Sequence, residues 1–346
     1  MATANSYRRE LQTMRGTKTR ITSTSMFRWR KLGKIFDPRD YPGPPWRKEY
    51  AQAPATLIFD NFVRVYFSCR PQRDEDGQFV SYSAYVDLDR RDLFKIIEIA
   101  ENPILSLGKK GCFDEWGTYP VSVIRGDRDE VWAYYAGWTR PISVPFNTAI
   151  GFARSTNDGK TFERLGDGPV LSFSIDEPFV LSGPKIRKFN NVYHLFYIAG
   201  RKWTVVNGRP EISHKIRLAT SDDGVHWIKY NRDLVADRWG NNESQASPDV
   251  FHANGKYHMF FCGWVPESFR DTRSRKIGYA SSTDLLHWAR EDSKAGIDVA
   301  EGEAFDNEML AYPHVFELDG KTYMLYLGNE VGRYGFGLAE LEGELR

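Results

Sequence analysis

Short apolar segments, separated by turn residues, recur along the chain in the same order. Each repeat opens on a segment that contains a proline, and successive prolines are 64 to 66 residues apart. These prolines are Pro54, Pro120, Pro184, Pro248 and Pro313. A second, aromatic segment follows in every repeat, as in FVRVYFS, EVWAYYAGW and KYHMFFCGW. A fixed period sustained over 346 residues is typical of a repeat architecture.

The turns between these segments carry the residues that tight hairpins need. Asn254 precedes Gly255 and Asp319 precedes Gly320, and such pairs tolerate the positive φ of hairpin turns. A third segment follows in three repeats (AIGFARSTNDGKTFERL, IRLATSDDGVHWIKY, IGYASSTDLLHWARE), and short fourth segments such as PILSL, PVLSF and DLVAD lead to the next proline. We therefore predict an all-β fold, a single five-bladed β-propeller with four-stranded blades. The blades start near residues 54, 120, 184, 248 and 313.

The ring has to close, and the N-terminal region supplies the missing strand. The last repeat ends at its third segment, YGFGLAEL, whereas Trp29–Phe36 (WRKLGKIF) resembles a fourth segment. We predict that this N-terminal strand completes the last blade. The propeller then spans residues 26–346, and residues 1–25 form a basic, mobile tail. Unrelated tandem domains fit the even spacing less well.

The composition argues against several classes of function. A net charge of +1 argues against a bulk electrostatic surface for nucleic acid, and no apolar run reaches the roughly 18 residues of a membrane span. The three cysteines form no Cys-x-x-Cys pair, so we expect neither disulfides nor zinc. We expect a cytoplasmic protein without metal or cofactor, acting on a small-molecule or oligosaccharide substrate. The oligomeric state stays open.

Acidic residues recur at one position of the repeat. A glutamate stands five residues before the proline in four repeats: Glu49, Glu115, Glu243 and Glu308. The third repeat has Glu177 nearby. We expect these glutamates, with Asp114, Asp176 and Asp306, to form an acidic ring at one mouth of the channel. Neighbouring carboxylates separate one another's pKa values, as general acid–base catalysis requires. We predict Glu243 and Glu308 as the catalytic pair, assisted by Glu115 and Glu177. The alternative is that such glutamates pair with arginines and fix the blades.

Cationic and aromatic residues follow the second segments, whose ends should reach the same mouth. The predicted substrate-binding residues are Glu49, Asp114, Arg70, Trp138, Arg140, Arg201, Trp264, Tyr312, His314 and Arg333. Guanidinium groups bind anionic ligands in a bidentate manner. The long loops Arg201–Ser213 and Val265–Arg275 are expected either to form walls of the pocket or to contact a partner.

Two motifs resemble known enzymes. The segment from Ser182 to Tyr197 (SGPKIRKFNNVYHLFY) resembles the third-blade segment of glycoside hydrolase family 43, and the recurring Ile-Gly-x-Ala-x-Ser element resembles those of families 32, 43, 68, 117 and 130. The resemblance covers residues 30–346 and implies a propeller that acts on glycosidic bonds. The three carboxylate positions of family 43 correspond here to Ala53, Tyr119 and Ser182. No family carboxylate is therefore carried over.

Three hypotheses follow. The first is a carbohydrate-active enzyme that cleaves or transfers a glycosyl unit by carboxylate acid–base catalysis in the central channel. The predicted arginines suggest that its substrate is an anionic sugar. The alternative is a non-catalytic propeller that binds a sugar or a partner protein, since the family carboxylates are missing. A third is an assembly scaffold that docks a partner through its basic tail.

Overall fold

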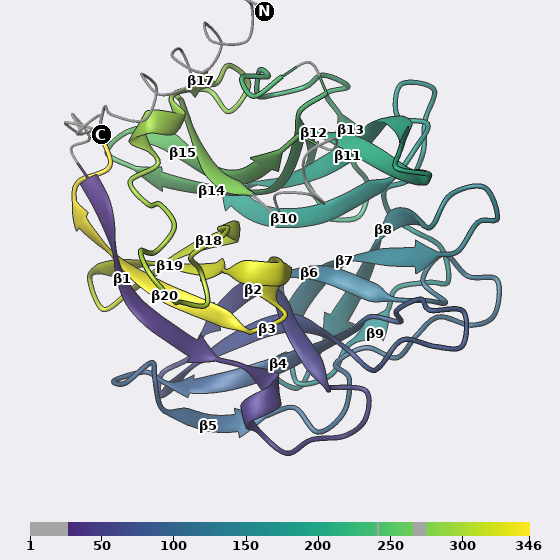
Figure 1. Cartoon of the computed structure of the whole chain (residues 1–346), viewed down its shortest axis with the longest axis horizontal. Coiled ribbons are helices and arrows are strands. Elements are labelled where there is room, and N and C mark those ends of the chain that lie inside the picture. Colours follow the sequence, from purple (N-terminus) through teal and green to yellow (C-terminus); the bar gives the residue numbers. More distant parts are fainter. Residues whose placement is uncertain (1–26, 241, 266–274) are drawn as a thin grey trace, which may run out of the picture.

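The computed structural model describes residues 27–240, 242–265 and 275–346. They form five four-stranded antiparallel sheets arranged as a ring, a five-bladed β-propeller (Figure 1). The predicted tail at residues 1–25 and most of the predicted loop Val265–Arg275 lie outside the described residues.

Each blade runs from an inner strand at the channel to an outer strand at the rim. Blade 1 contains β2 (Glu49–Ile58), β3 (Phe62–Arg70), β4 (Tyr82–Asp89) and β5 (Ile96–Ile99); blade 2 contains β6 (Thr118–Arg125), β7 (Val131–Thr139), β8 (Asn147–Ser155) and β9 (Glu163–Arg164). Blade 3 contains β10 (Leu181–Phe189), β11 (Val192–Val206), β12 (Arg209–Ser221) and β13 (Ile228–Lys229); blade 4 contains β14 (Ser244–Ala253), β15 (Lys256–Trp264), β16 (Lys276–Ser282) and β17 (Ala289–Arg290). Blade 5 contains β18 (Ala311–Leu318), β19 (Lys321–Leu327) and β20 (Phe336–Gly343), and is completed by β1 (Phe27–Phe36). Short helical turns occupy Pro38–Asp40, Asp292–Lys294 and Asn329–Gly332.

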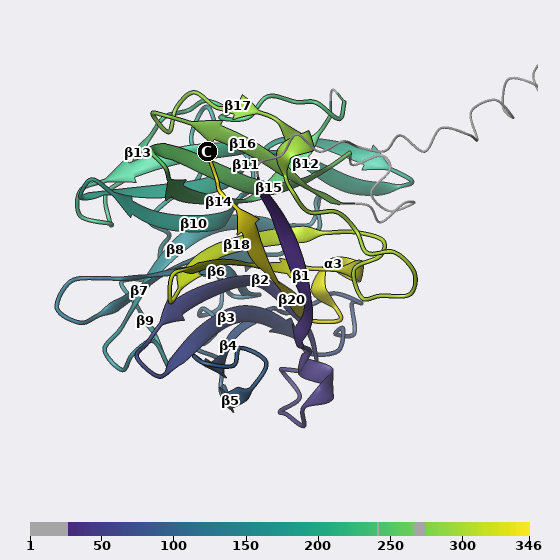
Figure 2. The ribbon, with the colours of Figure 1, turned by 90° about the vertical axis from the view of Figure 1, so that its left-hand side faces the viewer.

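The predicted closure is confirmed. Strand β1 pairs antiparallel with β20, from Phe27 opposite Gly343 to Phe36 opposite Phe336 (Figure 2). The number of strands per blade is also confirmed, but the fourth strands are misplaced. In blades 2 and 3 the outer strands are only two residues long and come directly after the third-strand turns, so the segments PVLSF and DLVAD are connections. The predicted loop Arg201–Ser213 is instead the extended tip of the β11–β12 hairpin.

The recurring proline marks a bulge on every inner strand. The pairing register shifts at this point in all five blades. The residue before the proline has a positive φ in Ala53, Gly183, Ser247 and Tyr312, between 49° and 59°. A bulge turns a side chain away from the regular pleat, and here the irregular backbone lies at the mouth of the channel.

The Asp-Gly turns hold neighbouring blades together. The Tyr66 hydroxyl of blade 1 donates to the Gly159 carbonyl of blade 2 at 2.9 Å, and Tyr134 of blade 2 donates to the Gly224 carbonyl of blade 3 at 2.7 Å. A Cβ added at Gly159 would lie 2.0 Å from the Tyr66 hydroxyl oxygen. These turns therefore need glycine both for φ and for the close approach of the tyrosine.

Candidate binding site at the central mouth

A pocket of about 200 Å³ opens at the end of the channel where the second strands finish, and all five blades contribute to it. It is lined by Arg70, Tyr119, Pro120, Trp138, Phe146, Val180, Ser182, Gly183, Ile198, His214, Ala246, Ser247, Trp264, Arg275 and Tyr312. We call it the central pocket. Among the described residues, no aspartate or glutamate lines it.

Two arginines flank a pair of tyrosines in this pocket. The Tyr119 hydroxyl donates to the Tyr312 hydroxyl at 3.2 Å. Arg70 Cζ lies 5.7 Å from the Tyr119 ring centroid, and Arg275 Cζ lies 5.8 Å from the Tyr312 centroid and 3.8 Å from the Trp264 ring. Burial raises the pKa of Tyr119 well above its ordinary value. Tyr119 therefore offers a neutral hydroxyl, and the hydrogen-bonded tyrosine pair lies between two cations.

The Arg70 guanidinium is fixed by rings rather than by carboxylates. Its Cζ lies 4.9 Å from the Tyr50 centroid and 4.8 Å from the Phe79 centroid, besides Tyr119. Its Nε is buried without a hydrogen-bond partner among the residues that the structure describes, and the same holds for the hydroxyl of Ser247, which is only 2 % exposed. Buried polar groups are almost always paired in native proteins. These atoms are therefore suited to receive a polar ligand.

An aromatic wall leads from the tyrosine pair to the β11–β12 hairpin. The centroids of Tyr119 and Trp138 are 6.0 Å apart, those of Trp138 and Phe146 are 4.6 Å apart, and those of Phe146 and Trp203 are 5.6 Å apart. The Trp138 indole also donates to the Tyr119 carbonyl. Flat apolar faces of this kind can lie against sugar rings.

His214 adds a neutral imidazole. Burial, and secondarily the Arg275 charge, lowers its pKa to about 3. The Ser244 hydroxyl oxygen accepts the His214 backbone N–H at 3.1 Å and lies 3.1 Å from the ring Nδ1. The ring is thus held as an uncharged hydrogen-bonding group at the pocket wall.

A buried polar layer is formed by residues that follow the inner-strand prolines. Arg187 Nη2 donates to Asp249 at 2.6 Å, and His314 Nδ1 lies 3.6 Å from Asp249 and 3.4 Å from Lys185 Nζ. The Thr56 backbone N–H donates to His314 Nε2 at 3.0 Å. Burial lowers the pKa of Lys185 to about 8 and that of His314 to about 4. His314, predicted to bind substrate, belongs to this layer and does not line the central pocket.

The acidic residues do not form the predicted ring. Glu243 is fully buried inside blade 4, where it lies 2.6 Å from Arg290 and accepts the backbone N–H groups of Arg238 and Trp239 at 2.7 and 2.8 Å. Burial alone would raise the pKa of Glu243, but these donors hold it below its ordinary value.

Other blades repeat this arrangement, which we call the blade cluster: a buried acid, an aromatic residue of the second strand and a cation near the outer edge. Glu177 accepts the Tyr197 hydroxyl at 2.7 Å and lies 2.6 Å from Lys229. Asp114 likewise contacts Tyr135 at 2.9 Å and Arg164 at 2.7 Å, and Asp306 contacts Lys31 at 2.7 Å. These acids serve their own blades, which corrects the expectation that Glu177, Glu243, Asp114 and Asp306 converge on the channel.

The remaining predicted acids lie near the surface. Glu308 and Asp176 are exposed, and Glu115 accepts the Gly111 backbone N–H at 2.8 Å. Glu49 is paired with Arg333 at 2.9 Å. None of the four lines the central pocket.

Some of the predicted substrate-binding residues line the central pocket and others lie outside it. Arg70, Trp138, Trp264 and Tyr312 line the central pocket, whereas Arg140, Arg201 and Arg333 do not. Arg140 pairs with Asp74 at 2.6 Å, and Arg201 lies 3.9 Å from Asp233. The sequence prediction missed Phe146, His214, Ser247, Arg275, Tyr119 and Ser182. The last two could have been found, because they occupy the positions that correspond to family 43 carboxylates.

Metal-binding clusters are absent from the described residues: across 27–240, 242–265 and 275–346, no group of three or more His, Cys, Asp or Glu side chains is placed to hold a metal ion. The helical segments in these ranges include none with the length and apolar character of a membrane span.

The fold and pocket define a five-bladed β-propeller of the kind found in glycoside hydrolases. A solved glycoside hydrolase superimposes with a TM-score of 0.69 at 15% identity, covering 91% of this chain and 92% of the other. A structure from the GH130 family of mannoside phosphorylases gives 0.61 at 14% identity, covering 92% of both chains. Identities this low show the fold alone.

No protein-family model matches the chain. The chain belongs to the same family as the uncharacterized protein Rv1502 of Mycobacterium tuberculosis strain H37Rv, to which it is 37% identical over 315 residues, 91% of this chain and 99% of the relative. The corresponding protein of strain CDC 1551 matches equally well. A more distant match, 28% identical over 178 residues, is the beta-1,2-mannobiose phosphorylase of Thermoanaerobacter sp. (strain X514), of which it spans 54%.

Proposed function

We propose that the protein is a carbohydrate-active enzyme that transfers or cleaves a glycosyl unit, with a sugar ring against the aromatic wall and an oxyanion between Arg70 and Arg275. The observation that carries the proposal is the convergence of two arginines on the Tyr119–Tyr312 pair in a pocket without a lining carboxylate among the described residues. Guanidinium groups favour phosphate and carboxylate because their donors match the geometry of these anions.

The oxyanion has two possible sources, the sugar's own acidic group and inorganic phosphate. Hydrolysis by a pair of carboxylates needs both carboxylates beside the bond, and the described residues that line this pocket include none. Phosphate as the attacking group avoids that need. One oxygen of dihydrogen phosphate bonds to the anomeric carbon while the glycosidic bond breaks, and its proton passes to the leaving oxygen. The partial match to a mannobiose phosphorylase agrees with this chemistry.

The test is a panel of neutral and acidic glycosides, assayed for sugar release with and without inorganic phosphate. Phosphate-dependent release of a sugar phosphate supports phosphorolysis, and release from acidic glycosides alone supports an anionic substrate. In either case Arg70→Gln should lower kcat/KM at least tenfold. Indifference both to phosphate and to substrate charge would refute the proposal. The catalytic assignment of Glu115, Glu308, Glu177 and Glu243 stays a prediction, tested by their Gln variants in the same assay.

A second candidate function is sugar binding without turnover, which the lack of a lining carboxylate favours. Saturable binding by calorimetry, with no product from any member of the panel, would identify it.

A further inference from the structure

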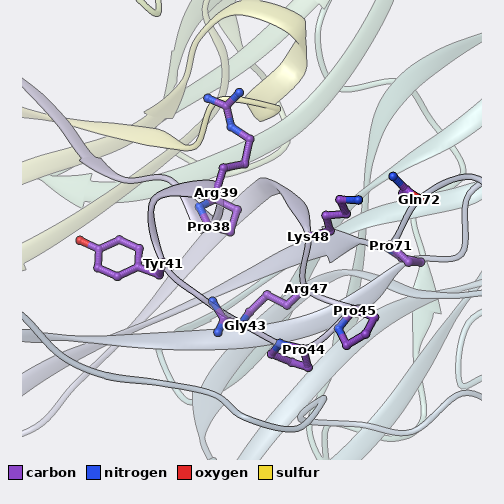
Figure 3. Close-up of a pocket in the computed structure, with 10 residues that line it drawn as sticks. All are labelled: Pro38, Arg39, Tyr41, Gly43, Pro44, Pro45, Arg47, Lys48, Pro71 and Gln72. Atoms are coloured by element: carbon purple, nitrogen blue, oxygen red, sulfur yellow. The ribbon is translucent and has the colours of Figure 1, made fainter.

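A second pocket, of about 500 Å³, lies against the connection between β1 and β2 (Figure 3). It is lined by Pro38, Arg39, Tyr41, Gly43, Pro44, Pro45, Arg47, Lys48, Pro71 and Gln72. We call it the outer pocket. No carboxylate lines it among the described residues, although three cationic residues do. Its volume is within the range of small-molecule sites, roughly 300–1,000 Å³.

The three cations are not equivalent. Arg39 is neutralised by Asp37, whose carboxylate lies 2.6 Å from its Nη2, and its guanidinium lies over the Tyr334 ring. Lys48 is exposed, and no ion pair of Lys48 is found among the described residues. The charges without a counterion in the outer pocket are therefore those of Lys48 and Arg47.

Arg47 is the unusual group. It is only 5 % exposed, yet its Nε and Nη1 are buried without a hydrogen-bond partner among the described residues. Within the described part of the chain, the hydrogen bond of its side chain is long, from Nη2 to the Pro42 carbonyl at 3.4 Å. Burial lowers the pKa of Arg47, but a guanidinium stays charged at neutral pH. Holding such a charge unpaired costs several kcal/mol, which a bound anion would offset.

The loop is shaped around this side chain. In Figure 3 the Arg47 side chain runs toward Gly43, and a Cβ added at Gly43 would lie 2.5 Å from Nη2. The Arg47 backbone N–H donates to the Pro44 carbonyl at 3.0 Å, and the Lys48 N–H donates to the Arg70 carbonyl at 3.2 Å. Prolines restrict the backbone of this loop. The site is therefore preorganised rather than dependent on closure.

We propose that the outer pocket is a second ligand site, which binds a small molecule carrying a phosphate or carboxylate group on Arg47 and Lys48, with its apolar part against the proline and Tyr41 walls. This site is separate from the central pocket, and the proposal does not depend on the proposed activity. Strand β3 connects the two, because Arg70 lines the central pocket and the next two residues line the outer one.

The experiment uses Arg70→Gln protein, in which we expect the central pocket to bind anions at least tenfold more weakly, and the substitutions below assign the binding that remains. Calorimetry and thermal melting are measured with inorganic phosphate, glucose 1-phosphate, citrate and, as a neutral control, glucose. We expect saturable binding of at least one anion, with a rise in melting temperature, and none of glucose. Phosphate-bearing probes binding better than citrate would identify a phosphate ligand, and the reverse a carboxylate.

Two further substitutions in the same background locate the site. Arg47→Met should abolish binding without lowering the melting temperature of the free protein, because it removes an unpaired buried charge. Lys48→Gln, at an exposed position, should weaken binding about tenfold, the effect of one charge-assisted hydrogen bond. Absence of saturable anion binding, or binding that neither substitution weakens, would overturn the proposal.

Discussion

The blade clusters and the central pocket are both built from charged and aromatic side chains, but they differ in symmetry. Glu177 and Glu243 occupy related positions in successive blades, and each finds its cation within its own blade. The residues before the recurring prolines are equally related by the repeat, yet they are Ala53, Tyr119, Gly183, Ser247 and Tyr312. The last four of these residues line the central pocket. Tyr119 and Tyr312, on the two blades that flank blade 1, have the same side chain, and the others differ.

Residues that recur from blade to blade and residues that differ between blades have different roles. Blades 2 to 5 each bury an acid in a blade cluster, because each of these blades packs its second and outer strands in the same way. A sugar has no five-fold symmetry, so a binding site on the propeller axis needs different side chains from the different blades. The buried acids Asp114, Glu177, Glu243 and Asp306 therefore indicate packing within their blades, and the irregular set of residues before the prolines indicates binding.

The largest expected effect is on stability, in a blade cluster. Glu243→Ala removes one of the two carboxylate partners of the buried Arg290, which keeps Asp292 at 2.8 Å, and leaves the backbone N–H groups of Arg238 and Trp239 without their acceptor. Loss of one member of a buried ion pair costs about 3–5 kcal/mol. Urea unfolding should show this loss, whereas Glu308→Ala at an exposed position should change stability by less than about 0.5 kcal/mol. Equal effects would remove the distinction between the two glutamates.

The next effect is the pH dependence of the buried layer around the channel. Burial lowers the pKa of His314 to about 4 and that of His214 to about 3, against about 6.5 in an unfolded chain. Between about pH 6.5 and 4 the unfolded state binds protons that the folded state does not. The free energy of unfolding therefore decreases as the pH is lowered, by up to about 1.4 kcal/mol per pH unit for each of the two histidines. Asp249, whose pKa is lowered by Arg187 and its other partners against the effect of burial, adds a further loss below about pH 4.

His314→Gln should therefore reduce the slope of the unfolding free energy against pH in this range, by up to the amount that corresponds to one bound proton. A slope that His314→Gln does not alter would show that this histidine is protonated in the folded protein.

The third effect is on ligand affinity, and it compares Arg70, in the central pocket, with Arg201, outside it. Arg70→Gln should weaken the binding of an oxyanion ligand to the central pocket about tenfold or more, with a small change in melting temperature because the side chain is partly exposed. Arg201→Gln, outside the pocket, should leave affinity unchanged. Calorimetry with the best ligand of the panel provides the comparison, and equal losses would contradict it.

The smallest effect concerns the end of the aromatic wall. Trp203→Ala removes an edge contact to Phe146, of a kind that contributes about 0.5–1.5 kcal/mol. Affinity for a disaccharide should fall by about threefold, with less effect on a monosaccharide. Val205→Ser, on an exposed residue of the same hairpin, serves as the control. If the disaccharide is unaffected, the wall ends at Phe146.

Much of the fold was predictable because it rests on local signals that repeat. Proline spacing, Asp-Gly turns and the unpaired third segment of the last repeat sufficed for the blade number and for the pairing of β1 with β20. Residues on strands were also placed well: Arg70, Trp138 and Trp264 end second strands, and strand direction determines which mouth they reach.

The acids were misplaced because they lie before the inner strands begin. Glu243 precedes β14 by one residue and Glu177 precedes β10 by four. In such connections, periodicity does not determine whether a side chain points to the axis or back into the blade. That direction depends on distant partners such as Arg290 and Lys229, which are not recognisable from local spacing.

The most direct measurement is a crystal structure of the protein soaked with inorganic phosphate and a mixture of monosaccharides. The account predicts an oxyanion in contact with Arg70 and Arg275, and a sugar ring against Trp138 or Phe146, with Glu177 and Glu243 still bonded within their blades. Ligand held by either of those glutamates, with the arginines unoccupied, would contradict it.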